Sequence, residues 1–148
     1  IKVLSAVDNI VGVKEATGDI VRGKEVIEIC QSEDFQIYSG DDPAAMSLMF
    51  IGAQGCISVT ANVVPKTYHD LCRFAMAGDK EQAKSLNDGL AVLNKCLFLE
   101  SNPIPVKWAL HTMGKIGPGL RLPLTTMDEI YHDYFRSTLE QVGIIQNQ

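Results

Sequence analysis

The sequence has little of what marks several large classes of protein. Lysine and arginine form no cluster and the formal net charge is −5, so the chain lacks the basic surface typical of nucleic-acid-binding proteins. No apolar run reaches the roughly 18 residues that a membrane span needs, so we expect no membrane segment. The chain has no C-x-x-C pair and its three histidines form no i, i+4 pair, so we expect no metal site.

The four cysteines are widely and irregularly spaced, at Cys30, Cys56, Cys72 and Cys96. We interpret them as reduced core residues rather than disulfide partners or metal ligands. This interpretation predicts a cytoplasmic protein. The length of 148 residues, with 46% hydrophobic and 21% charged residues, is typical of one globular domain.

The first part of the chain alternates between short apolar runs and helical patterns. Strands are predicted to begin near Ile10, Phe35 and Cys56, and the third is expected to run to Val59. Each strand is followed by a helix, so that one unit takes roughly 20 to 25 residues, a size that predicts parallel strands with right-handed crossovers. The fold class is therefore α/β, either a slice of an open doubly wound sheet or a slice of a (β/α)8 TIM barrel.

Several helix starts are marked by capping residues. Asp19 is a predicted N-cap, and Asp42 with Pro43 is predicted to open the second helix. Residues 126–129 (TMDE) predict a capping box for the last helix, whose buried side should include Ile130.

From Asp79 onward the pattern is purely helical. We therefore expect residues 1–78 to form three βα units and residues 79–148 to form a C-terminal helical domain. A three-stranded parallel sheet alone would leave apolar edges unpaired, and a complete barrel needs about 250 residues. Because the chain also starts at Ile1 without methionine, we expect it to be the C-terminal part of a longer protein.

Lys14 is the clearest candidate for chemistry. Residues 10–13 form an apolar run, and the predicted strand ends on this lysine. Functional groups of parallel-sheet enzymes lie at the carboxyl ends of strands, which is where Lys14 stands. By position alone, a solvated residue that merely follows a strand is the simpler interpretation.

Four motifs strengthen the case for chemistry: VKEATG at residues 13–18, SGDD at 39–42, GCISVTAN at 55–62 and NPIPVK at 102–107. In order and spacing they resemble the dihydrodipicolinate synthase family, within the pyruvate-dependent class I aldolase/lyase superfamily. The resemblance covers the chain and is to the second half of the family's polypeptide. It implies barrel strands six to eight followed by the C-terminal helical domain.

The resemblance also implies a reaction and its nucleophile. The family condenses pyruvate with L-aspartate semialdehyde on the route to diaminopimelate and lysine. Lys14 matches the lysine that forms a Schiff base with the pyruvate keto carbon. A primary amine is required because only it gives the protonated imine that acidifies the pyruvate methyl group, and it must be partly uncharged near neutral pH. No cofactor is implied.

Two further residues match substrate-binding positions of the family. Ile57 matches the residue whose main-chain carbonyl lies against pyruvate, although it would also serve as an ordinary core isoleucine. Gly40 matches a pocket-wall position where a side chain would crowd the substrate, and a plain turn glycine is the alternative. Glu15 should point away from Lys14 across the strand, so we predict a hydrogen-bonding or ion-pair role for it rather than that of a general base.

The family's other catalytic groups belong to its first half. We therefore expect this chain to need the N-terminal half of the same enzyme as its partner and to be inactive alone. The nearest alternative is N-acetylneuraminate lyase or a 2-keto-3-deoxy sugar acid aldolase of the same superfamily, although NPIPVK at residues 102–107 favours the synthase. A non-catalytic helical fragment is the alternative from another class.

The helix predicted after Pro43 is apolar on nearly every face, which is more than covering a sheet requires. We interpret Met46, Met49 and Phe50 as a subunit contact, in line with the homotetramers common in the family. Coverage of this helix by the C-terminal helices is the alternative.

Overall fold

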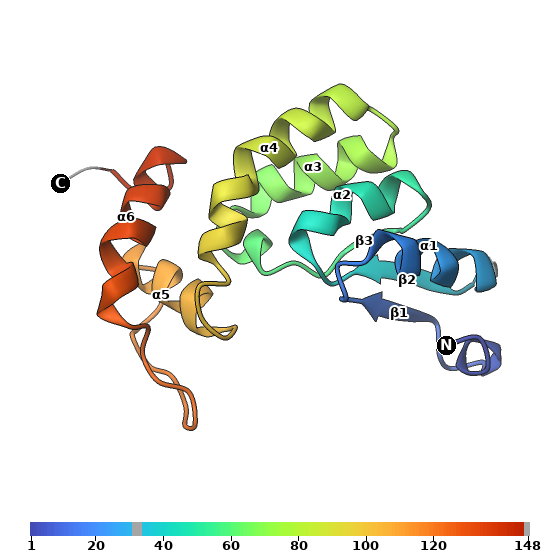
Figure 1. Ribbon diagram of the computed structural model, residues 1–148, viewed down its shortest axis with the longest axis horizontal. Coiled ribbons are helices and arrows are strands. Elements are labelled where there is room, and N and C mark those ends of the chain that lie inside the picture. The colour runs from blue at the N-terminus through green and yellow to red at the C-terminus, as the bar shows by residue number, and fades with distance from the viewer. Residues whose placement is uncertain (31–33, 147–148) are drawn as a thin grey trace. The chain divides into compact units, whose positions relative to one another are not determined.

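The computed structural model describes residues 1–30 and 34–146, and Figure 1 shows the elements along the chain. Within these two ranges, no helix combines the length and the apolarity of a membrane span. The described strands are β1 (Gly12–Glu15), β2 (Gln36–Ser39) and β3 (Gly55–Cys56). The described α-helices are α1 (Ile20–Ile29), α2 (Asp42–Phe50), α3 (Pro65–Met76), α4 (Lys80–Cys96), α5 (Ile104–Thr112) and α6 (His132–Gln141), with 3-10 turns η1 (Leu4–Ala6), η2 (Thr60–Asn62) and η3 (Glu129–Tyr131).

The three strands form one parallel sheet in the order β1-β2-β3, as the β-α repeat predicts. Lys14 of β1 pairs with Tyr38 of β2, and Ser39 of β2 pairs with Cys56 of β3. The carboxyl ends of the three strands therefore lie at the same edge of the sheet. α2 packs against α1, β2 and β3. A buried apolar cluster contains Val26 of α1, Ile37 of β2, and Cys30 and Phe35 from the chain between these two elements.

The predicted starts of the first two helices are confirmed. Asp19 caps α1, because its Oδ1 accepts hydrogen bonds from the N–H groups of Val21 (2.8 Å) and Arg22 (3.1 Å). α2 begins at Asp42 with a proline in its first turn, and the preceding Asp41 supplies the cap through the N–H of Ala44 (2.9 Å). These starts are set by residues within three positions of the cap, which explains why the sequence predicted them.

The third strand is shorter than predicted. β3 contains two residues, although the expected strand ran to Val59. Ile57 N–H still donates to Ser39 O (2.8 Å), but the chain then turns into η2, where the Thr60 hydroxyl donates to Asn94 Oδ1 (2.6 Å). Thr60 is buried, and this hydrogen bond to a distant helix ends the extended conformation.

The predicted capping box of the last helix is wrong. Asp128 caps the turn η3 by accepting the N–H of Ile130 (3.0 Å), and α6 begins only at His132. The N–H of Asp128 is itself bound by Glu100 Oε1 (2.9 Å), which holds Asp128 in an extended conformation. Ile130, which was expected on the buried side of the helix, is exposed.

The expected separate C-terminal helical domain is also wrong. The chain divides into two compact units: unit 1 is Ile1–Ser58 with His69–Asn87, and unit 2 is Val59–Tyr68 with Asp88–Gln148. Because α3 and α4 each contribute residues to both units, no boundary separates the βα repeat from the later helices.

Unit 2 has a core of its own. α5 packs against α6 and against η2, and Trp108 stacks on Phe135 with ring centroids 5.2 Å apart. Trp108 also stacks on His132, at 5.0 Å. The fully buried side chains of this unit include Leu93, Leu97, Phe135 and Leu139.

Candidate active site

Lys14 stands one residue before the end of β1, at the sheet edge where the three strands end. Its backbone is held in register opposite Tyr38, whereas its side chain is exposed in this chain. The pairing of β1 with β2 thus holds the Lys14 backbone in place, and the side chain with its amine is exposed. That placement suits a nucleophile that must reach a small electrophile.

Gly40 lies directly against the Lys14 side chain. A Cβ at this position would lie 2.5 Å from Lys14 Cε and 2.6 Å from Ala16 Cβ, both too close for real contacts. Gly40 does not have a left-handed φ, so close approach, and not a turn conformation, explains the glycine. Its N–H donates to Glu15 O at 2.6 Å, which fastens the end of β2 to the end of β1.

Ile57 follows β3 at the same edge of the sheet. Its N–H donates to Ser39 O (2.8 Å), so its main chain is bound to the end of β2. Its side chain is 51% exposed, so the residues of this chain do not bury it. Lys14, Gly40 and Ile57 therefore follow one another across the carboxyl ends of neighbouring strands.

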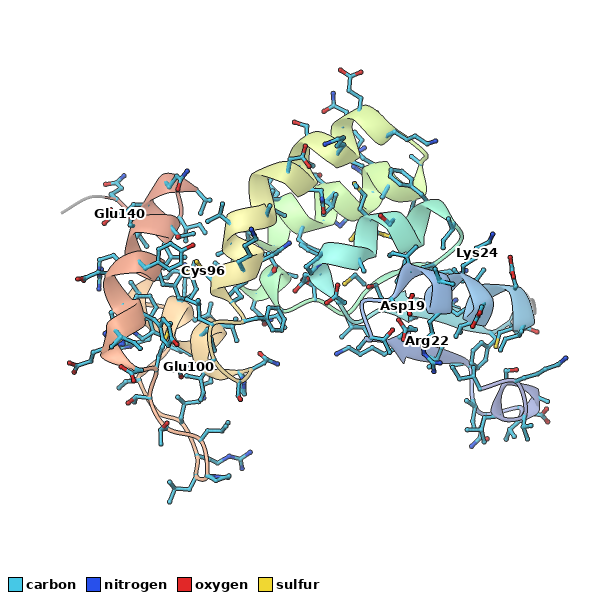
Figure 2. The ribbon with its side chains drawn as sticks, in the orientation of Figure 1. Asp19, Arg22, Lys24, Cys96, Glu100 and Glu140 are labelled. Atoms are coloured by element: carbon cyan, nitrogen blue, oxygen red, sulfur yellow. The ribbon has the colours of Figure 1, made fainter. Side chains whose placement is uncertain are left out.

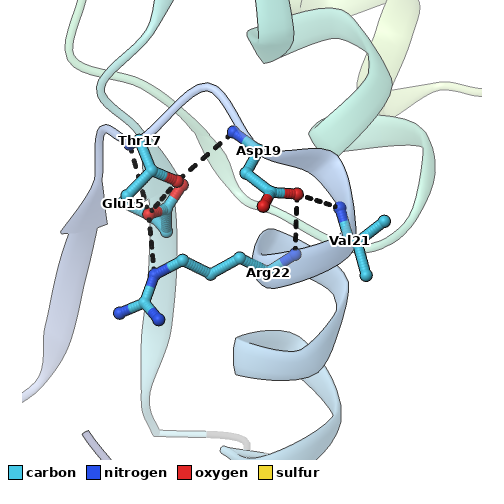
Figure 3. A network of polar contacts seen from close by, with 5 residues as sticks. All are labelled: Glu15, Thr17, Asp19, Val21 and Arg22. Carbon is cyan, nitrogen blue, oxygen red and sulfur yellow. Dashed lines mark hydrogen bonds and ion pairs between the residues drawn. The ribbon is translucent and has the colours of Figure 1, made fainter.

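Glu15 points to the buried side of the sheet, as the alternation of side chains predicts. Its Oε1 accepts a hydrogen bond from the Thr17 hydroxyl (2.7 Å) and lies 3.5 Å from Arg22 Nε (Figure 3). The predicted hydrogen-bonding and ion-pair role of Glu15 is therefore confirmed.

The sequence did not identify Thr17 and Arg22 as the partners of Glu15. The available signal was Glu15 itself, because a carboxylate on a buried strand face needs donors. Arg22 is the next basic residue along the chain after Lys14, and the capped first turn of α1 brings it back over the strand end.

An acid and two thiols lie near the start of α2. Asp42 is buried, and Cys56 Sγ lies 4.0 Å from Asp42 Oδ1. Burial raises the pKa of the Cys72 thiol above its ordinary value, and the Asp42 carboxylate raises that pKa further. None of the four cysteines, which all lie among the described residues, forms a disulfide. Among the residues that the structure describes, no three His, Cys, Asp or Glu side chains are grouped so that they could hold a metal ion.

Comparison with known proteins identifies close relatives. A sequence profile described as "Dihydrodipicolinate synthetase family" matches residues 1–142. The 4-hydroxy-tetrahydrodipicolinate synthases of Pseudomonas aeruginosa and Stutzerimonas stutzeri are 55% and 54% identical over 142 residues, which make up 96% of this chain and 48% of each relative. The chain therefore spans about half the length of the curated relatives it matches.

A solved structure gives the same result. The chloride-inhibited dihydrodipicolinate synthase from Acinetobacter baumannii, crystallised in complex with pyruvate, is 51% identical with a TM-score of 0.94. The match covers 97% of this chain and 49% of that one. It decides between the two folds that the sequence left open: the sheet is part of a TIM barrel and not of an open doubly wound sheet.

Proposed function

Because this chain belongs to the dihydrodipicolinate synthetase family, we propose that it is the C-terminal half of a 4-hydroxy-tetrahydrodipicolinate synthase. The whole enzyme would be a lyase that condenses pyruvate with L-aspartate semialdehyde in diaminopimelate and lysine biosynthesis. The observation that carries this proposal is a lysine at the carboxyl end of a parallel strand, with a glycine packed against its stem.

Lys14 is the nucleophile in this proposal. Its uncharged amine adds to the keto carbon of pyruvate, and loss of water leaves an imine whose protonated form withdraws electrons from the neighbouring methyl group. The methyl group then loses a proton, and the resulting enamine carbon adds to the aldehyde carbon of the semialdehyde. No metal or cofactor takes part in these steps.

The main chain around Lys14 would receive pyruvate. We assign the Ile57 carbonyl to a contact with bound pyruvate, because Ile57 matches that position of the family. Its N–H donates to Ser39 O, which holds this part of the main chain beside β2. Gly40 would form the wall beside the nucleophile, where any side chain meets the Lys14 stem. Both assignments rest on the match of these residues to the family's substrate-binding positions, and the place of both at the carboxyl ends of the strands supports them.

The remaining parts of the site would come from the N-terminal half of the same enzyme. In this proposal residues 1–78 supply the last three βα units of the barrel, strands six to eight. Val11 and Ile57 are apolar and exposed in this chain, as expected of side chains that the rest of a barrel covers. The chain alone is then inactive. The reduced state of the four cysteines supports a cytoplasmic location for the enzyme.

The test is borohydride trapping with pyruvate. The chain is studied alone and after co-expression with the N-terminal half, and the peptides are analysed by mass spectrometry. A reduced pyruvate adduct on the Lys14 peptide is expected only in the reconstituted sample. Lys14→Arg keeps a cation but cannot form the imine, so it should abolish the adduct.

Three results would change the proposal. No adduct in a folded, reconstituted sample would leave Lys14 as a strand-end lysine and favour the non-catalytic fragment. An adduct in the chain alone would show that the fragment carries more of the site. Turnover with a sugar aldehyde in place of the semialdehyde would assign the chain to one of the sibling aldolases.

We also propose that the whole enzyme is a homotetramer with α2 at a subunit contact. Of the three residues predicted there, Met49 is buried within this chain, whereas Met46 and Phe50 are partly exposed. We therefore limit the proposed subunit contact to Met46 and Phe50. Phe50→Glu should lower the assembly mass of the reconstituted enzyme in analytical ultracentrifugation, and an unchanged mass would refute the contact.

A further inference from the structure

Glu15 follows Lys14 directly in the chain, and the proposed reaction leaves it unused. Only 4% of its side chain is exposed. Its Oε1 accepts hydrogen bonds from the Thr17 hydroxyl (2.7 Å) and the Thr17 N–H (3.2 Å), and it lies 3.5 Å from Arg22 Nε. Its Oε2 is buried and has no hydrogen-bond partner among the described residues. Because a buried carboxylate with one unbound oxygen is destabilising, its presence here calls for an explanation.

The contacts of Glu15 extend to the first turn of α1. Thr17 Oγ1 accepts the N–H of Asp19 (3.3 Å), and Asp19 Oδ1 accepts the N–H of Arg22 (3.1 Å). Figure 3 shows this network running from the end of β1 to the start of the helix. An apolar side chain of similar size would fill the buried space with a smaller desolvation penalty, but it could not bind the strand end to the helix.

The main chain of Glu15 connects this network to Lys14. Its carbonyl accepts the N–H of Gly40 at 2.6 Å, and Gly40 lies against the Lys14 stem. The peptide group between Lys14 and Glu15 is planar and stiff. A displacement of Glu15 therefore moves both the backbone that carries Lys14 and the glycine beside it.

We propose that Glu15 is a positioning residue for Lys14. Through Thr17 and Arg22 it holds the end of β1, and this places the Lys14 amine for its attack on the keto carbon. The inference rests on the proposed function, because it concerns the rate of that attack. It gives Glu15 no contact with the substrate and no proton to transfer.

The test measures the rate constant of imine formation in the reconstituted enzyme. Borohydride is added at successive times after saturating pyruvate, and the adduct on the Lys14 peptide is quantified. Glu15→Leu removes every contact of the carboxylate and should slow the reaction roughly tenfold. Glu15→Gln keeps an oxygen for Thr17 and should stay within about threefold of the wild type. The pyruvate concentration that gives half the maximal rate should not change.

Two further variants separate positioning from folding. A variant that folds poorly lowers the final amount of adduct but not the rate constant of its folded molecules, so both are recorded. Thr17→Val keeps the shape of the threonine without its hydroxyl and should also slow the reaction. Lys24→Gln is the matched control. Lys24 lies on the same helix as Arg22 (Figure 2), and its substitution breaks a different ion pair, Lys24–Glu28 at 3.7 Å. It should leave the rate constant unchanged.

The outcomes distinguish the two proposals. If the wild type forms no adduct at Lys14, both the proposed function and the role of Glu15 are overturned. If the wild type forms the adduct and both Glu15→Leu and Thr17→Val match its rate constant, the role of Glu15 is wrong and the proposed function stands. A slowing by Lys24→Gln equal to that of Glu15→Leu would also overturn the specific role of Glu15.

Discussion

The sheet edge of unit 1 and the core of unit 2 differ in how the chain covers its own apolar side chains. In unit 2, Phe135 and Leu139 are completely buried. At the carboxyl ends of the strands in unit 1, Ile57 is 51% exposed and the Lys14 side chain is also exposed. The candidate site thus lies where this chain leaves side chains exposed.

The largest effect on stability is expected in the core of unit 2. Phe135→Ala removes a fully buried ring that stacks on Trp108, so the free energy of unfolding should fall by about 3–5 kcal/mol in urea titration. Ile130→Ala, at an exposed position nearby in sequence, is the control and should change it by less than about 0.5 kcal/mol. Equal effects of the two substitutions would show that the core is not packed as described.

A smaller effect is expected at Gly40. In Gly40→Ala the new methyl group meets Ala16 and the Lys14 stem, so the free energy of unfolding should fall by about 1–3 kcal/mol. Gly119→Ala is the control, because a Cβ there has nothing within 4 Å. In the reconstituted enzyme Gly40→Ala should also slow adduct formation, since Lys14 is displaced. Normal stability and a normal rate would contradict the close approach.

The pKa of the Cys72 thiol provides a test of its burial in unit 1. Because burial raises its pKa, the folded chain holds this proton at a pH where the unfolded chain has lost it. The free energy of unfolding should not change with pH below the ordinary pKa of a thiol. It should fall as the pH rises from that pKa through the higher pKa of the folded chain. Labelling of Cys72 by iodoacetamide, followed by mass spectrometry, should reach half its maximal rate at a higher pH in the folded chain than in urea. The same midpoint in both states would contradict this.

The smallest effect is expected at Val11. In this chain Val11→Ser should change the free energy of unfolding by less than about 0.5 kcal/mol, because the side chain is already exposed. In the reconstituted enzyme the same substitution should lower the free energy of unfolding by about 1–2 kcal/mol if the rest of the barrel covers Val11. Equal changes in the free energy of unfolding in the two samples would show that the rest of the barrel does not cover Val11.

Features decided by neighbouring residues could be predicted from the sequence. The cap at Asp19 and the opening of α2 depend on a few adjacent positions, and the parallel strand order follows from the β-α repeat. The start of α6 depends on Glu100, which lies 28 residues before Asp128. No local pattern shows that contact.

The same distinction applies to the site. The sequence placed Lys14 at a strand end and predicted a hydrogen-bonding or ion-pair role for Glu15. It could not show that Gly40 touches the Lys14 stem, because this contact depends on the register between β1 and β2. The prediction of a separate helical domain was wrong for a similar reason. Local sequence patterns indicate where helices form, but they do not show which residues pack together in the folded chain.

The short hydrogen bond from the Gly40 N–H to Glu15 O makes this amide a natural spectroscopic reporter. It lies on the backbone next to the amine but takes no part in the chemistry. In an NMR spectrum its proton should exchange slowly with solvent and its resonance should shift when the amine beside it changes its chemical state. The resonance of a single glycine amide would then report whether the Lys14 amine is unmodified or has formed an imine.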